Sequence, residues 1–157
     1  MSHLFYLVGP PGSGKRTVGK ALSALTGAAL LDNHLTNDPV FLAAGISGNE
    51  PVSDEVWALC FAVRQSVRTA TLHTPPTLAH IFTNYLTAQD QEWMNVERLR
   101  QLAAARGVPF VPVWLTWPLP ADALVLDTSR LGPQEAARQI VAFAGGVPVA
   151  DALASPG

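Results

Sequence analysis

Cysteine, charge and long apolar runs are all scarce in this sequence. The single cysteine, Cys60, excludes an internal disulfide and leaves no cysteine partners for a zinc site. Only 14% of the 157 residues are charged and the net charge is −2, so no broad basic surface for DNA or RNA is expected. The N-terminal apolar run, Leu4–Val8, is too short for a signal peptide or a membrane span. We therefore expect a cytoplasmic monomer or homodimer without nucleic-acid or membrane partners.

Apolar residues make up 48% of the chain, and its length suits one domain, residues 1–157, with a substantial core. Apolar runs typical of buried strands occur at Leu4–Val8, Ala28–Leu31, Leu78–Thr83, Phe110–Leu115 and Ala123–Leu126. Segments with helical signals lie between and after them. This alternation predicts an α/β three-layer sandwich with a mostly parallel five-stranded sheet. We expect the first strand at its centre, with the fifth strand beside it and parallel to it.

Capping signals and periodicity indicate where the helices begin and end. One helix should run from Lys15 to Leu25, and another should start at Pro39 with Asp38 as its N-cap. A longer helix should start behind Ser53. Its apolar residues at helical spacing predict one stripe that faces the core: Val56, Cys60, Val63, Val67 and Ala70. A fourth helix should end at Gly107, and a fifth should begin at Pro133 and end near Gly145.

The stretch VGPPGSGKRT contains the spacing G-x-x-x-x-G-K, formed by Gly9, Gly14 and Lys15. It follows an expected strand and precedes an expected helix, which is the context that a phosphate-binding loop requires. Glycines let backbone N–H groups converge on phosphate oxygens, the helix N-terminus adds positive potential, and the lysine reaches the β- and γ-phosphates. The alternative is an ordinary glycine turn between a strand and a helix.

Arg16 stands where a serine or threonine usually coordinates magnesium, and Thr17 follows it. This ending resembles the nucleoside-monophosphate-kinase-like group of small P-loop kinases, whose adenylate kinases also lack a hydroxyl directly after the lysine. The resemblance implies ATP and Mg²⁺ as cofactors, with Thr17 at the α-phosphate and the metal held largely through water. Arg16 should point away from the loop rather than replace a metal ligand, because two adjacent cations repel. The implied cofactor-binding residues are Gly9, Pro10, Pro11, Gly12, Ser13, Gly14, Lys15, Arg16, Thr17 and Arg130.

Asp32 ends the second expected strand, so it should share a sheet edge with Gly9 and Asn84. In the shikimate-kinase-like and gluconate-kinase-like proteins that this stretch resembles, an acidic residue here faces the acceptor hydroxyl. A carboxylate can take the hydroxyl proton and hold a magnesium-bound water, which makes Asp32 and Lys15 the catalytic candidates and Asp32 and Thr17 the metal candidates. Asp32 could instead cap a turn or helix. Asp32, His34 and Asn84 are the candidates for binding the acceptor, and His34 is alternatively a solvated loop residue.

The stretch LVLDTSRLGPQEAARQI resembles the last strand and helix of the same proteins. There the loop after the strand flanks the adenine, which implies that Thr128, Ser129 and Arg130 line the base and that Arg130 stacks on it. Thr128 and Ser129 could also simply shape the turn, and the two interpretations are compatible.

Few residues separate the fourth and fifth expected strands, although a parallel crossover needs roughly a dozen or more. The resembling kinases place a mobile, arginine-bearing lid at this point. Either the fifth strand is antiparallel, or the chain lacks a lid, or lid residues are missing between about 115 and 121. We favour the third explanation, and it predicts a break between Leu115 and Ala121.

The resemblance spans nearly the whole chain, but only the phosphate-binding loop is a specific motif. It implies an ATP-dependent phosphotransferase, similar also to chloramphenicol phosphotransferases, that acts on a hydroxyl of a small metabolite or antibiotic. The alternative is a P-loop protein that binds ATP without transferring its phosphoryl group, which Arg16 favours and Asp32 opposes. A GTPase is a weaker choice, because there is no N-K-x-D motif for guanine.

Overall fold

The computed structural model describes residues 2–47, 50–85, 90–115 and 124–146, of which 90–93 are described by their backbone alone. Five strands form one parallel sheet: β1 Leu4–Val8, β2 Ala29–Leu31, β3 His80–Asn84, β4 Phe110–Leu115 and β5 Leu124–Leu126. Five helices flank it: α1 Lys15–Thr26, α2 His34–Ala43, α3 Asp54–Thr71, α4 Asp90–Ala105 and α5 Pro133–Ala144. Among these helices, none is both long and apolar enough to cross a membrane. The predicted three-layer α/β fold is confirmed.

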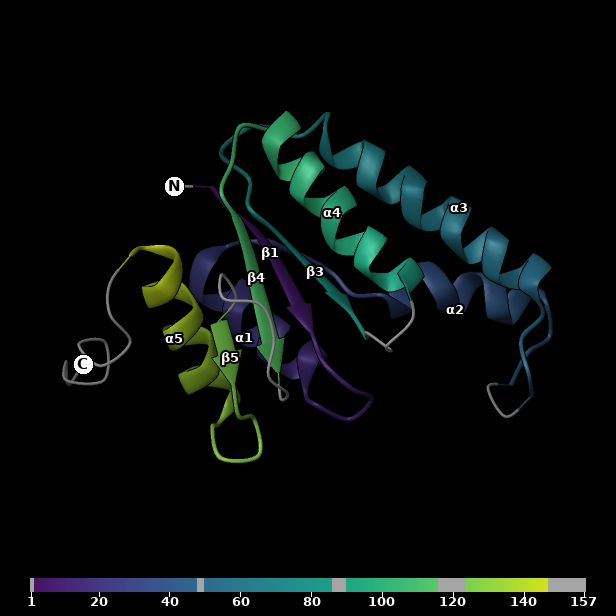
Figure 1. Cartoon of the computed structure of the whole chain (residues 1–157), viewed down its shortest axis with the longest axis horizontal. Helices are drawn as coiled ribbons and strands as arrows, with labels where there is room; N and C mark the ends of the chain where they lie inside the picture. Colours follow the sequence, from purple (N-terminus) through teal and green to yellow (C-terminus); the bar gives the residue numbers. More distant parts are fainter. Residues whose placement is uncertain (1, 48–49, 86–89, 116–123, 147–157) are drawn as a thin grey trace.

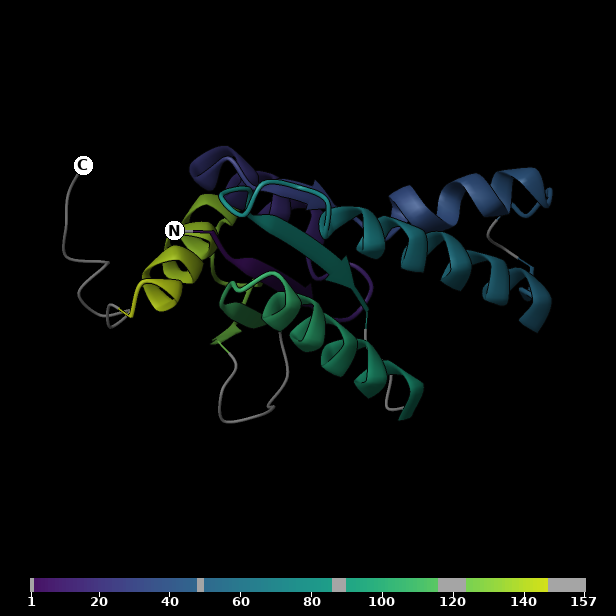
Figure 2. The ribbon, with the colours of Figure 1, turned by 90° about the horizontal axis from the view of Figure 1, so that it is seen from above.

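The side chains of β1 alternate between the two faces of the sheet, as the pleat of a strand requires. Phe5 and Leu7 point into one core with residues of α1 and α5, whereas Leu4, Tyr6 and Val8 point into a second core with residues of α4. Figures 1 and 2 show α2 and α3 extending beyond the sheet, at the opposite end of the molecule from α5. The strand is buried on both faces, which explains its unbroken apolar sequence.

The strand register brings three of the expected site residues to one edge of the sheet. Val8 is level with Asn84 on β3, and Leu31 is level with Phe82 on the same strand. Gly9, directly after β1, and Asp32, directly after β2, therefore emerge at the edge where β3 ends in Asn84. The prediction that carboxyl ends of neighbouring strands gather these residues is confirmed.

The position predicted for the fifth strand is wrong. The sheet order is β2-β3-β1-β4-β5, so β1 is flanked by β3 and β4, and β5 lies at the outer edge. Its pairing with β4 is parallel, which also rules out the antiparallel alternative. Leu124 is level with Val113, two residues before the end of β4, so the chain returns by only about 7 Å along the sheet. This register shortens the path that the connection has to cover along the sheet.

The lid and the chain break predicted between about residues 115 and 121 fall on residues 116–123. These lie outside the described residues, so the structure does not test the prediction. The helix start predicted at Pro39 is wrong, because α2 begins at His34 and Pro39 lies inside it. The carboxylate of Asp32 accepts a hydrogen bond from the backbone N–H of His34 at 3.0 Å in the turn that leads into the helix, and Asn33 is the N-cap residue.

The stripe predicted on α3 is also wrong in part. Cys60 is 1% exposed, but Val56, Val63 and Val67 are half-buried and Ala70 is exposed. Arg68 and Thr71 are the other buried residues of the helix. Because α3 packs against α2 rather than flat on the sheet, its inner face is polar as well as apolar.

Buried His80, at the start of β3, gives the fold a specific dependence on pH. It is 2% exposed, and its Nδ1 lies 2.6 Å from the guanidinium of Arg106. Burial, with the charge of Arg106, lowers the pKa of His80 to about 4. In the unfolded chain its pKa is about 6.5. The neutral imidazole therefore stabilises the fold fully above about pH 6.5, and this contribution is lost as the pH falls toward 4.

We expect the free energy of unfolding to fall by about 1–2 kcal/mol between pH 7 and pH 5, on the scale of about 1.4 kcal/mol for each unit of pKa difference. Urea unfolding at the two pH values measures this loss, and His80→Gln should remove most of it because glutamine does not titrate. An equal loss in the parent protein and the variant would show that other groups cause it.

Candidate nucleotide and acceptor site

The loop between β1 and α1 has a conformation that requires its glycines. Gly12 and Gly14 both have φ of +79°, in the left-handed region that other residues rarely adopt. A Cβ on Gly9 would lie 2.5 Å from the carbonyl oxygen of Leu115, so only glycine fits there. The backbone N–H of Ser13 donates to Pro10 across the loop at 3.2 Å. The loop therefore closes tightly in front of the α1 N-terminus, as a phosphate-binding loop does.

Lys15 folds back over this loop. Its Nζ donates to the carbonyl oxygens of Gly9 at 2.8 Å and Pro10 at 2.7 Å, and it lies 3.3 Å from the Oγ of Ser13. Burial lowers the pKa of Lys15, and the negative charge of Asp32 opposes that shift. The ammonium group is thus held at the mouth of the loop by acceptors that phosphate oxygens could replace.

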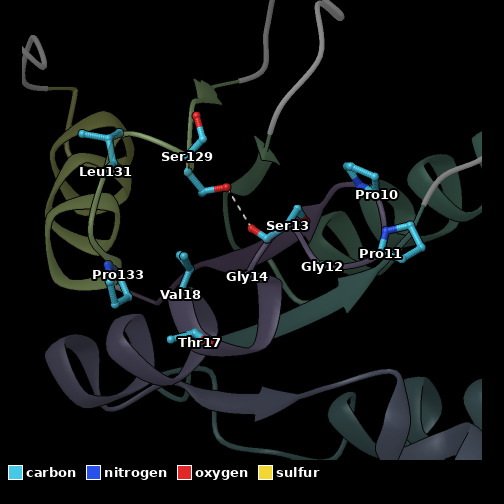
Figure 3. Close-up of a pocket in the computed structure, with 11 residues that line it drawn as sticks. Pro10, Pro11, Gly12, Ser13, Gly14, Thr17, Val18, Ser129, Leu131 and Pro133 are labelled. Carbon is cyan, nitrogen blue, oxygen red and sulfur yellow. Dashed lines mark hydrogen bonds between the residues drawn. The ribbon is translucent and has the colours of Figure 1, made fainter.

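A pocket of about 450 Å³ opens on the other side of the loop (Figure 3). It lies between the loop and the segment that joins β5 to α5, and the Oγ1 of Thr128 donates to the carbonyl of Ser13 at 2.9 Å. The lining residues are Pro10, Pro11, Gly12, Ser13, Gly14, Thr17, Val18, Thr128, Ser129, Leu131 and Pro133. This volume lies within the usual range of ligand pockets.

The pocket includes most of the cofactor residues predicted from the sequence. Arg130 does not line it, whereas apolar Leu131 and Pro133, which the sequence reasoning missed, do. Ser129 bonds the carboxylate of Asp127 through its backbone N–H at 3.0 Å, so this serine shapes the turn as well as lining the pocket. The hydroxyl of Ser129 donates a second hydrogen bond to the same carboxylate. Together the two bonds lower the pKa of Asp127.

Asp32 is only 4% exposed, and its two carboxylate oxygens have different surroundings. Oδ1 accepts from the backbone N–H of His34, so Asp32 caps the turn that precedes α2, whose N-cap residue is Asn33. Oδ2 is buried without a hydrogen-bond partner, and its ion-pair partner is Arg16, whose Nε lies 3.7 Å away. Arg16 does not line the pocket beside the loop, although it was among the expected cofactor-binding residues; its guanidinium faces Asp32 instead. Oδ2 therefore accepts no hydrogen bond from the residues that the structure describes, and Arg16 is its ion-pair partner.

Two further candidates lie on the acceptor side of the loop. Asn84 is 6% exposed and lines cavities on that side. His34 is exposed and its Nδ1 lies 3.3 Å from Asp38, yet it lines a cavity next to Lys15, so both of its proposed roles stay open. Within the described part of the chain, no cluster of three or more His, Cys, Asp or Glu side chains could hold a metal ion alone. Mg²⁺ commonly needs only one or two carboxylates plus substrate phosphates, which suits the free oxygen of Asp32.

Two large cavities extend from Lys15 toward α3 and α4. The first, about 710 Å³, is lined by Lys15, Asn33, His34 and an aromatic pair, Phe41 and Trp57, whose rings meet edge to face. The second, about 720 Å³, lies between α3 and α4. The two cavities adjoin each other, because Trp57 and Tyr85 line both of them.

The sequence reasoning missed the arginines of this region. Arg64 and Arg98 line the second cavity, and Arg64 and Arg68 line a narrow pocket of about 20 Å³ beside Asp32. The spacing of Cys60, Arg64 and Arg68 on α3 is the signal that could have found them, because residues four apart share one helix face.

No protein-family model and no curated protein matches this sequence. Among solved structures, a protein of Chloroflexus aurantiacus superimposes with a TM-score of 0.68 at 13% identity, over 94% of this chain and 98% of the other. The tunicamycin resistance protein of Deinococcus radiodurans gives 0.59 at 16% identity, over 94% and 98%. Shikimate kinase of Acinetobacter baumannii, solved with shikimate, gives 0.58 at 16% identity, over 93% and 94%. The structural neighbours are small P-loop kinases, and at these identities the likeness establishes the fold.

Proposed function

We propose that this chain, which has the fold of the small P-loop kinases, transfers the γ-phosphoryl group of ATP to a hydroxyl of a small molecule. The observation that carries the proposal is the buried carboxylate of Asp32, which has one free oxygen and lies close enough to Lys15 to influence its pKa. A loop that only bound phosphate would not need such a group. A phosphotransferase needs it to accept the proton of the attacking hydroxyl.

The chain's own groups divide the work of this reaction. The backbone N–H groups of the loop and Lys15 bind the β- and γ-phosphates and neutralise the charge that develops on the leaving ADP. The acceptor oxygen forms a bond to the γ-phosphorus while the bond to the β,γ-bridging oxygen breaks, and the acceptor proton passes to Oδ2 of Asp32. Thr17 and the pocket beside Leu131 and Pro133 hold the rest of the nucleotide. Mg²⁺, held by Asp32 and Thr17 through water and by the phosphates, would supply further neutralisation of phosphate charge.

The printed names of the neighbours suggest a range of acceptors for a first screen. They include enzymes named for shikimate and gluconate and a tunicamycin resistance protein. We therefore include hydroxy acids, sugars and antibiotics in the panel.

We expect ATP and ADP to raise the melting temperature, and ADP to form from ATP only when a suitable hydroxyl compound is present. The phosphate loop and its adjoining pocket bind the folded state alone, so the nucleotide shifts the unfolding equilibrium. Melting curves with and without Mg²⁺, followed by a coupled assay of ADP release over the panel, measure both effects. The assay without acceptor is the control for simple ATP hydrolysis.

A second candidate function, ATP binding without phosphoryl transfer, is favoured by the ion pair of Arg16 with Asp32. The ion pair engages Oδ2, the oxygen that the transferase reaction requires. Stabilisation by ATP without ADP release on any acceptor of the panel would support this candidate and contradict the transferase.

A further inference from the structure

Three arginines converge beside the second cavity, and we call them the arginine cluster: Arg64 and Arg68 on α3, and Arg98 on α4. Arg64 and Arg98 line the cavity of about 720 Å³, and Arg68 lies behind it, in the narrow pocket that it shares with Arg64 and Asp32. The three are close enough that Arg64 and Arg98 both disfavour the charge on Arg68.

All the described partners of this cluster are neutral. Arg64 donates to the side-chain oxygen of Asn37 at 3.1 Å, and Arg98 lies 4.8 Å from the centre of the Phe61 ring. Arg68 donates to Gln65 and Asn95 at 2.8 and 3.1 Å. In the part of the chain that the structure describes, no carboxylate lies within 4.0 Å of the three guanidinium groups, whereas Arg16, Arg100 and Arg138 each have one. The charge of the cluster is therefore uncompensated by ion pairs.

Arg68 is the member of the cluster whose positive charge is least favourable in its surroundings. It is 7% exposed and its Nε is buried without a hydrogen-bond partner. Burial lowers its pKa to about 10, and Arg64 and Arg98 act in the same direction, with Tyr6 opposing them. A buried charge without a counter-charge destabilises a fold, and natural proteins tolerate one mainly where it has a function. A ligand anion in the neighbouring cavity would supply the missing negative charge.

We propose that the acceptor carries an anionic group, a carboxylate, sulfate or phosphate, which Arg64 and Arg98 bind in the cavity between α3 and α4. This proposal rests on the proposed function and names the class of its substrate. The cavity adjoins the one next to Lys15, so a single molecule can place its anion at the cluster and its hydroxyl beside Lys15 and Asn33, the residue that follows Asp32. Guanidinium groups suit such anions because they donate two parallel hydrogen bonds.

Two carboxylates also border these spaces, and neither removes the need for an anion. Asp54 lines the same cavity, but it lies ten residues from Arg64 on α3, about 15 Å along the helix axis. Asp32 lines the narrow pocket, but its ion-pair partner is Arg16, and it also faces Lys15. The remaining wall includes Trp57, Phe61 and Met94, which suit an apolar body between the anion and the hydroxyl.

The first test is direct binding of sulfate to the protein saturated with ADP and Mg²⁺, which fills the nucleotide loop. Melting temperature and tryptophan fluorescence are followed as sodium sulfate is added, against sodium chloride at equal ionic strength. We expect a saturable effect of sulfate that Arg64→Gln and Arg98→Gln weaken by about fivefold to tenfold, the scale of one charge-assisted hydrogen bond. Arg100→Gln, two residues along α4 and paired with Glu97, is the matched control and should respond as the parent does.

The second test compares acceptors in matched pairs, shikimate and gluconate against their neutral amides. We expect a kcat/KM at least tenfold higher for the anion of any pair that reacts, and Arg64→Gln should erase the preference while Arg64→Lys retains part of it. Sulfate binding that is absent, or unchanged in Arg64→Gln and Arg98→Gln, overturns the proposal, and so does equal transfer to the neutral amide. Sulfate binding that is lost in the variants, with no transfer to any acceptor, supports the anion site and overturns the proposed function alone.

Discussion

Replacement of Lys15 by alanine is expected to abolish the stabilisation of this protein by ATP and ADP. At a hundredfold excess over its dissociation constant, a ligand that binds only the folded state contributes about 2.7 kcal/mol. For a domain of this size that corresponds to a rise in melting temperature of about 5–10 °C. Lys15 is the group whose ammonium already lies at the mouth of the loop, 2.8 Å from the carbonyl of Gly9. Without it, the β- and γ-phosphates lose their main positive partner.

Lys20→Ala is the matched control, because it removes an exposed lysine from the same helix, α1. The ligand-induced rise in melting temperature is measured for each variant against its own nucleotide-free form, which separates binding from intrinsic stability. A rise in Lys15→Ala equal to that in the parent protein would mean that the nucleotide binds elsewhere, and the phosphate-loop assignment would fail.

Much of the fold is local in origin, and for that reason the sequence predicts it well. The bounds of β1 and β4 agree with their apolar runs, and α1 ends at Gly27, whose φ of +72° is the left-handed cap that glycine favours. The start of α2 was missed because a proline inside a helix resembles a proline at its first turn. The turn at Asp32 and Asn33 leads into the helix five residues before that proline.

Sheet order is a different kind of property, because it depends on which strands pair across the whole chain. Each strand could be read from its own residues, but no residue of β5 indicates whether it borders β1 or β4. The short return from β4 permits parallel pairing with β4 itself, since β5 pairs only with the last three residues of that strand. The connection itself falls on residues 116–123, outside the described residues, so the argument about its length stays a prediction.

Some residues of the candidate site could be predicted from the sequence and others could not. Gly9, Asp32 and Asn84 were predictable, because the residues that follow parallel strands meet at one edge. The arginine cluster was not, because it forms only when α3 and α4 lie side by side, with Arg68 bonded to Asn95 across the two helices. A pattern that counts apolar residues assigns the inner face of α3 to a core, although much of that face lines a cavity.

The effect of Arg16, which departs from the usual motif, becomes clear only from its position in the structure. In the sequence it is a missing hydroxyl, and in the structure its Nε lies 3.7 Å from Oδ2 of Asp32. With the Arg16 side chain 62% exposed, this pair contributes little to stability. Its consequence is chemical, since it sets the electrostatic surroundings of the carboxylate that we propose as the base. The roles of the two residues therefore have to be tested together.

Asp32→Asn is expected to leave ATP binding nearly intact and to lower phosphoryl transfer by about a hundredfold or more, the scale on which loss of a general base acts. Asparagine retains an Oδ1 that can accept from the backbone N–H of His34, so the start of α2 is preserved. It removes the negative charge and the ability of Oδ2 to take a proton. The rate of ADP release on the best acceptor of the panel, together with the nucleotide-induced rise in melting temperature, measures the two effects separately.

Two further variants test the other contacts of Asp32. Arg16→Gln removes its ion pair, and Asp32→Ala removes its hydrogen bond from the backbone N–H of His34. If Asp32 matters only as the partner of Arg16, then Arg16→Gln should lose as much activity as Asp32→Asn does. If Asp32 is the base, the Arg16→Gln variant should keep most of the activity of the parent protein. If Asp32 is only a cap, then Asp32→Ala should lose about 1 kcal/mol of stability, the usual effect of removing a capping side chain, while Asp32→Asn stays active. A fully active Asp32→Asn variant would therefore assign the residue to the helix start and leave the reaction without a base among the residues at this edge.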